Sequence, residues 1–466
     1  MEFSHYDDNQ NLSLTKFESM LKTNHVLFFD ANEFDNIIHH YLENGKMSLA
    51  KKAIKLGLAQ HPSSVSLKLF LIEVLVFDNK LEKAETLLEE LQAIEPLNEE
   101  VYIQKANILS KRDEHAKAID LFKQILTFTN EASEIHAFIG MEYLFLDDFE
   151  NAKTYFMKCI EADKEDYSAL YNIVYCFDFL EQHQEAIDYL TVYLDSNPYC
   201  EVAWHQLGKQ YIHLKEYEKA LASYDFAIIS DDRFIGAYLE KGKVLEKLNR
   251  YEEAIENYKI TLALDDPTSF ALLRIGSCYE KLGNKDLAIK HYYKTIDEDP
   301  LLDKGWIAIT KYYMRGKDFE KAKFYINKGL NIDAENVNYW KLYALVHHKL
   351  NLLEEAENGY KKALELGNYE LDTWLARADI LIQLGDYRIA IQSLLQAGEF
   401  YEDHPEIEYR LTGLYFTIND YDEGYIHLNN ALHLDPEYYI IIEELFPKIY
   451  NRPSIRQIIT NFKKSA

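Results

Sequence analysis

An alanine recurs every 34 residues through most of this chain. Eleven such alanines appear in succession, and the next step of the same length reaches a glycine: Ala50, Ala84, Ala118, Ala152, Ala186, Ala220, Ala254, Ala288, Ala322, Ala356, Ala390 and Gly424. The residue four places after each of them is Ile, Leu, Phe or Tyr without exception. A strict period with no insertion or deletion predicts stacked copies of one structural unit, each burying its apolar face against its neighbours.

The stretch from Glu201 to Phe234 contains one complete copy of the unit. Small and apolar residues recur there at helical spacing in two groups: Trp204, Leu207, Gly208 and Tyr211, then Tyr217, Ala220, Tyr224 and Ala227. This pattern predicts two short amphipathic helices. Gly208 is small where the first helix must let its neighbour approach, and Ala220 is small where the second helix returns against the first.

This pattern resembles the tetratricopeptide repeat. That repeat has an aromatic residue at position 4, Leu-Gly at 7 and 8, Tyr at 11, Ala at 20, an aromatic at 24, Ala at 27 and Pro at 32. The copy at 201–234 matches all of these except the last, where Asp232 stands. The resemblance implies an all-α fold, a right-handed superhelical solenoid of tandem helix-turn-helix repeats.

The resemblance also predicts how the chain is divided. Twelve repeats of 34 residues cover residues 31–438, an amino-terminal segment with a capping helix covers 1–30, and carboxyl-terminal capping helices cover 439–466. For residues 13–30 a second interpretation stays open, in which this segment is a strap lying in the groove of the solenoid. The four tryptophans all fall at position 4 of a repeat and are expected in the core: Trp204, Trp306, Trp340 and Trp374.

Composition limits the classes of partner. The net charge of −28 argues against nucleic acid or anionic lipid as the main partner, because both would be repelled. Apolar runs are too short to span a bilayer, and the amino end lacks the basic and apolar regions of a secretory signal. The four cysteines form no CxxC pair and are expected to be reduced packing residues. We therefore expect a cytoplasmic protein.

Signatures of catalysis are absent from the sequence. There is no Gly-rich phosphate loop, HExxH, CxxC or GxSxG motif. Two histidine pairs, His39 with His40 and His347 with His348, are adjacent in sequence and would point about 100° apart on a helix. The sequence therefore predicts a protein that is not an enzyme and has no cofactor and no metal.

The resemblance implies a binding function instead. In tetratricopeptide proteins the first helix of each repeat lines a concave groove, mostly through positions 2, 5, 9, 12 and 13, and the groove holds an extended peptide or a partner helix. Carried onto this sequence, one half of the lining is mainly apolar: Phe138, Met141, Phe145, Tyr171, Asn172, Tyr175 and Phe179. The other half is basic: Lys209, Lys243, Arg274 and Lys311.

Each half of this lining has two interpretations. The basic residues would hold the carboxylates of a partner, or would pair with nearby acids such as Glu240 and Glu246. The aromatic residues would anchor a peptide, or would be ordinary packing. We expect a non-catalytic scaffold or adaptor that binds a protein or peptide, and a partner with acidic segments would suit the basic half. The alternatives are a peptide-sensing regulatory receptor and a scaffold that assembles with itself.

Overall fold

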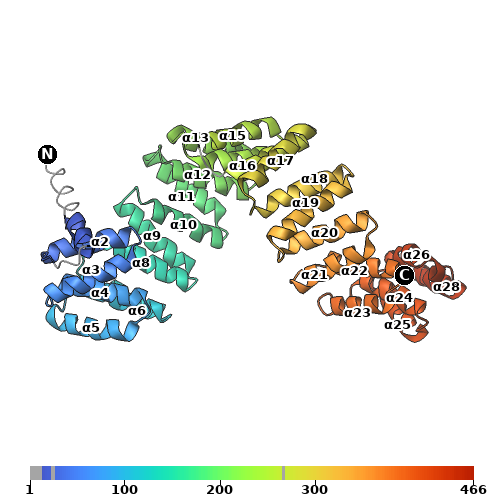
Figure 1. The fold of residues 1–466 in the computed structure, drawn as a ribbon, viewed down its shortest axis with the longest axis horizontal. Helices are drawn as coiled ribbons and strands as arrows, with labels where there is room; N and C mark the ends of the chain where they lie inside the picture. Colours follow the sequence, from blue (N-terminus) through green and yellow to red (C-terminus); the bar gives the residue numbers. More distant parts are fainter. Residues whose placement is uncertain (1–12, 23–26, 265–267, 466) are drawn as a thin grey trace. The chain divides into compact units, whose positions relative to one another are not determined.

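The fold is entirely helical in the computed structural model, which describes residues 13–22, 27–264 and 268–465 (Figure 1). No strand occurs in these ranges, which confirms the predicted all-α class. Contacts divide the chain into two compact units, the first ending at Asp232 and the second beginning at Arg233. Residues 1–12, on which the prediction of no secretory signal depends, lie outside the described residues.

The first unit consists of a helix over residues 13–22 followed by helix pairs. Successive helices along the chain pack against each other throughout the unit. The helices are α2 (Ala31–Glu43), α3 (Met47–Gln60), α4 (Val65–Phe77), α5 (Leu81–Ile94), α6 (Glu99–Lys111), α7 (His115–Ile125), α8 (Ala132–Phe145), α9 (Phe149–Ala162), α10 (Tyr167–Phe179), α11 (His183–Ser196), α12 (Glu201–His213) and α13 (Tyr217–Ser230).

The second unit repeats the same arrangement and ends in a group of short helices. Its paired helices are α14 (Ile235–Lys247), α15 (Tyr251–Ala263), α16 (Thr268–Lys281), α17 (Lys285–Glu298), α18 (Asp303–Arg315), α19 (Phe319–Ile332), α20 (Val337–Lys349), α21 (Leu353–Glu365), α22 (Leu371–Leu384), α23 (Tyr387–Gly398), α24 (Pro405–Thr417) and α25 (Tyr421–Leu434). The terminal group is η1 (Pro436–Tyr439), α26 (Ile440–Leu445), α27 (Pro447–Tyr450) and α28 (Pro453–Ser465).

A left-handed residue forms the turn inside every helix pair. These residues stand 34 positions apart: Gly45, Asn79, Asp113, Asp147, Glu181, Lys215, Asn249, Gly283, Lys317, Asn351, Gly385 and Asn419. The next N–H then bonds back to a carbonyl of the first helix, as Lys80 does to Leu75 at 2.8 Å and Arg250 to Leu245 at 2.8 Å. This is the hydrogen bond of a Schellman motif, which satisfies a carbonyl that the helix end would leave unpaired.

The recurring small residues allow the two helices of a pair to pack closely. All eleven alanines of the period are fully buried. A Cβ atom placed on Gly208 would come within 2.6 Å of the Tyr224 ring, and one on Gly242 within 2.6 Å of the Tyr258 ring. Both distances are shorter than a van der Waals contact. A larger residue therefore cannot replace either glycine while the tyrosine ring keeps its position. This confirms the role that the sequence predicts for Gly208.

The tryptophans only partly match the prediction. Trp306 and Trp374 are buried, as expected. Trp204 and Trp340 are half-buried, and each indole N–H bonds to a backbone carbonyl six residues earlier, at 2.8 and 2.7 Å. The prediction that all four are core residues was wrong for these two. The buried Trp306 makes the same bond to the Pro300 carbonyl, at 2.9 Å, so the indole N–H stabilises the loop before the helix whether or not the ring is fully buried.

The amino-terminal segment covers the first helix pair. Phe17, from the helix over residues 13–22, and Phe29 are both buried and pack with ring centroids 6.0 Å apart. Both also contact Phe34 of α2. The Gln60 side chain at the end of α3 accepts a hydrogen bond from the Phe29 N–H at 3.0 Å. These contacts favour a cap over a strap lying in the groove.

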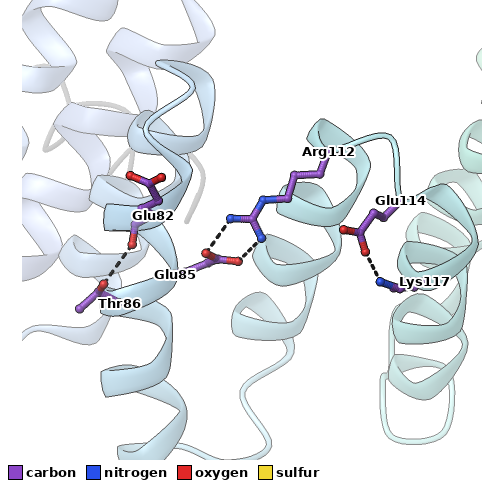
Figure 2. Close-up of polar contacts among 6 residues, drawn as sticks. All are labelled: Glu82, Glu85, Thr86, Arg112, Glu114 and Lys117. Carbon is purple, nitrogen blue, oxygen red and sulfur yellow. Dashed lines mark hydrogen bonds and ion pairs between the residues drawn. The ribbon is translucent and has the colours of Figure 1, made fainter.

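Ion pairs at the surface join neighbouring helix pairs (Figure 2). The guanidinium of Arg112, just after α6, donates two hydrogen bonds to Glu85 of α5, at 2.6 and 2.8 Å. Hydrogen bonding to Glu85 raises the pKa of Arg112. Glu114 pairs with Lys117 one turn further on. Such exposed pairs contribute little to stability, but they show that many surface charges already have partners.

All four cysteines are buried and carry free thiols, which confirms their predicted role in packing. Burial raises the pKa of Cys159 and of Cys176 to about 11. At neutral pH these thiols are therefore protonated and act as small apolar side chains.

His347 of α20 is a buried histidine whose titration links stability to pH. Its side chain is 3% exposed, and its Nδ1 lies 2.8 Å from the Tyr343 carbonyl oxygen, so Nδ1–H donates. Burial lowers the pKa of His347. The unfolded chain therefore binds this proton more readily, and the stability that neutral His347 contributes is complete above about pH 6.5 and is lost as the pH falls.

We expect His347→Leu to make the protein less sensitive to acid. The urea midpoint of the parent should fall between about pH 7.5 and pH 5.5, and the fall should be smaller in the variant. His348→Leu is the matched control and should retain the dependence of the parent. An equal fall in the parent and in His347→Leu would show that other groups cause the acid sensitivity.

Candidate functional site

The apolar half of the predicted groove lies mostly at the surface of the first unit. Met141 and Phe145 of α8 and Tyr171, Tyr175 and Phe179 of α10 are exposed. Phe138 behaves differently: it is half-buried, and its ring stacks on Phe122 of α7 with centroids 5.3 Å apart. We therefore assign Phe138 to packing and leave it out of the candidate surface.

Two exposed aromatic rings and one half-buried ring form a compact cluster. Phe179 stacks on Phe149 of α9 with centroids 4.6 Å apart, and Tyr175 lies 4.7 Å from Phe179. Phe149 is not among the predicted groove residues, because those positions lie in the first helix of each repeat and Phe149 begins a second helix. Rings held against each other in this way offer a rigid apolar surface at small entropic cost.

A small cavity of about 230 Å³ brings four predicted residues together. Tyr171, Asn172, Tyr175 and Lys209 line it, together with Val174, Asp178 and Gln206. Gln206 is 2% exposed, and its Oε1 has no hydrogen-bond partner among the described residues. A buried acceptor without a donor costs free energy, so this atom would be satisfied by an N–H or O–H group entering the cavity.

A larger cavity of about 730 Å³ lies in the second unit, and cations predominate among its charged lining residues. Its charged residues are one carboxylate and six cations: Glu280, Arg274, Lys281, Lys285, Lys304, Lys311 and Arg315. The remaining lining is largely apolar or aromatic, with Leu273, Ile307, Tyr312 and Tyr313 among its members. In a chain of net charge −28, this cavity concentrates positive charge.

Two matching networks hold the arginines of this cavity in place. Glu246 accepts hydrogen bonds from Tyr258 at 2.7 Å and from two nitrogens of Arg274 at 2.8 and 2.7 Å. Glu280 accepts from Tyr292 at 2.9 Å and from two nitrogens of Arg315 at 2.7 and 2.6 Å. Burial, reinforced by the adjacent Glu280, raises the pKa of Tyr292. Each arginine is therefore held by two hydrogen bonds to one carboxylate, which offsets its charge.

The lysines of the cavity have no such partners. For Lys281, Lys285, Lys304 and Lys311, the described part of the chain places no carboxylate oxygen within 4.0 Å of the ammonium group. Their charges are therefore available to a ligand. The sequence analysis omitted Lys304, although it stands at position 2 of its repeat, and Lys285, which begins a second helix.

Lys243 does not join this cavity. Its ammonium group pairs with Glu240 one turn earlier at 2.6 Å and lies 5.4 Å from the centre of the Phe270 ring. Of the predicted basic residues, Arg274 and Lys311 thus share the larger cavity, Lys209 lines the smaller one in the first unit, and Lys243 is paired on its own helix.

Family models match three parts of the chain, and all are described as tetratricopeptide repeat. One model matches residues 133–166 and 371–404, and a second matches 239–302. The first two matches are each 34 residues long and begin at predicted repeat starts, Ser133 and Leu371. The chain contains tetratricopeptide repeats. This fold is typical of proteins that bind other proteins along extended surfaces.

The chain is also similar, at low sequence identity, to solved structures. No curated protein sequence matches the chain. A tetratricopeptide repeat protein from Parabacteroides merdae is 18% identical, with 53% of this chain and 98% of that chain covered and a TM-score of 0.41. The Cut9–Hcn1 hetero-tetramer of APC/C is 12% identical, with 89% and 94% covered and a TM-score of 0.37. MamA is 23% identical, with 37% and 94% covered and a TM-score of 0.33.

Across the residues that the structure describes, no helix has both the length and the apolar character needed to cross a bilayer.

Proposed function

We propose that the chain is a non-catalytic, cytoplasmic interaction scaffold that binds an extended acidic segment of a partner protein in the cationic cavity of the second unit. The observation that carries this proposal is the set of four lysines without carboxylate partners in one concave site. Free buried thiols fit a reducing compartment.

The chemistry of the cavity favours a peptide with both acidic and apolar side chains. Lys281 and Lys311 would pair with carboxylates, while the apolar floor, including Leu273 and Ile307, would contact aliphatic or aromatic side chains of the ligand. Arg274 and Arg315 are already compensated by glutamates and would shape the site more than they attract the ligand. A preformed site of this kind loses little conformational entropy on binding.

Binding of a fluorescent peptide rich in glutamate and leucine tests this proposal. The full-length protein should bind it, and Lys281→Glu with Lys311→Glu should weaken the affinity by about tenfold or more, which is about 1.4 kcal/mol or more. Rising salt should weaken binding to the parent more than to the variant, because the variant has lost attractive charges.

Control variants separate the cavity from the overall charge. Lys361→Glu with Lys448→Glu makes the same change in net charge on exposed residues of the second unit that do not line the cavity. This control should bind as the parent does. Equal weakening by both double variants would attribute binding to the net charge and contradict the proposed site, as would the absence of binding to the parent. Measuring the molecular mass of the protein in solution would show whether self-association contributes to these results.

A further inference from the structure

Two histidines and an aspartate meet at one end of three consecutive helices in the first unit. Asp178 lies near the end of α10, His183 begins α11 and His213 ends α12. One nitrogen from each imidazole and one carboxylate oxygen lie within 4.8 Å of one another. The two rings stack with centroids 4.3 Å apart and planes 10° from parallel. The site is half-buried on the side of Asp178 and His183 and open to solvent at His213.

Gln210 of α12 fixes which nitrogen of His183 can bind a cation. The Gln210 side chain is fully buried, and its amide nitrogen donates to Asp178 Oδ1 at 2.8 Å. A carboxylate only accepts, so the amide nitrogen must face Asp178 and the amide oxygen must face His183. That oxygen lies 2.9 Å from His183 Nδ1. Nδ1 therefore carries the proton and donates, which leaves the lone pair on Nε2. Nδ1 is also the nitrogen that lies 3.7 Å from Asp178 Oδ1, so the His183 imidazole has to turn for Nε2 and Asp178 to hold one ion.

This arrangement is typical of metal-binding histidines. A histidine that binds a metal through one nitrogen usually donates the other N–H to a carbonyl or carboxylate, and a carboxylate ligand is itself hydrogen-bonded. Here Gln210 makes both contacts, to His183 and to Asp178. The same two repeat positions are hydrogen-bonded two repeats earlier, where His115 Nδ1 lies 2.8 Å from Glu142, so the bond to His183 also belongs to the packing of consecutive repeats. The additional bond from Gln210 to Asp178 is what orients the carboxylate here.

We propose that Asp178, His183 and His213 bind a divalent transition-metal ion, with zinc as the first candidate. Neutral imidazole nitrogens and a carboxylate oxygen are ligands that zinc accepts, and three protein ligands leave one tetrahedral position for water or for a group from a partner. The sequence analysis examined only adjacent histidines and predicted no metal. These ligands come from two repeats, so nothing in the local sequence joins them.

Zinc titration by calorimetry tests this site, using the full-length protein without a histidine tag. The parent should bind one zinc ion per chain at a site that His213→Ala removes or weakens by about tenfold or more. His213 is exposed, so this variant should stay folded, which circular dichroism would verify. His433→Ala, which removes an exposed histidine of the second unit, is the matched control and should bind as the parent does.

Cobalt provides a second readout. Cobalt(II) bound by two imidazoles and a carboxylate should give visible absorption bands in the parent and in His433→Ala, and these bands should be lost in His213→Ala and in His183→Gln. The proposal would be overturned if the parent bound no zinc at micromolar concentration. It would be overturned equally if His213→Ala bound zinc with the affinity of the parent.

Discussion

Replacing Gly413 by alanine is expected to lower the free energy of unfolding of the carboxyl-terminal part of the second unit by about 3 kcal/mol. A Cβ atom at this position would lie 2.1 Å from Cδ2 of Phe446 and within 2.5 Å of two further atoms of that ring. Phe446 is 5% exposed and belongs to the core formed by α24, α25 and the terminal helices. One added methyl group would therefore expel a buried aromatic ring.

Gly398→Ala is the matched control for this substitution. Gly398 ends α23, and a Cβ atom there would have no neighbour within 4 Å. This substitution should leave stability unchanged or raise it slightly, because alanine favours the helix. Hydrogen exchange of the amides in α24 and α26 would measure the effect locally, since repeat proteins can unfold from one end. Normal protection in Gly413→Ala would contradict the close approach of Phe446.

Replacing Asp379 by leucine is expected to cost about 2 to 3 kcal/mol of unfolding free energy. Asp379 of α22 accepts two hydrogen bonds from Arg410 of α24, at 2.8 and 3.0 Å. The Arg410 side chain is only 9% exposed, and after the substitution its remaining ion pair would be the longer contact with Glu406 at 3.3 Å. The magnitude is below that of a fully buried pair because the Asp379 side chain is 27% exposed.

The double variant Asp379→Leu with Arg410→Met distinguishes an unpaired charge from lost packing. Removing both charges should restore most of the stability, because apolar residues of similar size often replace a buried ion pair without loss. Urea unfolding would compare the single and double variants. Glu365→Ala, which breaks an exposed pair with Lys362, should have no measurable effect. If the double variant is as unstable as the single one, the cost comes from packing and not from charge.

Most of the fold could be predicted from the sequence, because the same pattern of small and large apolar residues recurs in every repeat. Helices begin at Glu201 and Tyr217, as the spacing of apolar residues indicates, and Gly208 meets Tyr224 as their small and large sizes require. The period could not predict the contact of Gly413 with Phe446. Phe446 belongs to the terminal helices, which are not copies of the repeat, so the pattern of the other repeats does not predict this contact.

The candidate sites were harder to predict than the fold. Phe149, His183 and Lys285 were all missed, and each is the first residue of the second helix in its repeat. The positions taken from the family resemblance cover only the first helix, whereas these side chains reach the aromatic cluster, the metal-site cluster and the cationic cavity respectively. Equivalent repeat positions can also differ in their contacts. Lys243 and Lys311 both stand at position 9 of a repeat, but Lys243 pairs with Glu240 whereas Lys311 lines a cavity.

The left-handed turn residues have a consequence for how such a chain can diverge. Glu181, Lys215 and Lys317 adopt the same backbone conformation with φ of 55°, 62° and 59°, and all three side chains are exposed. The turn therefore accepts either sign of charge, although glycine would be less strained there. A mutation at any of these positions would alter the surface potential without touching the packed alanines. Related proteins could thus differ in surface charge while keeping the same fold.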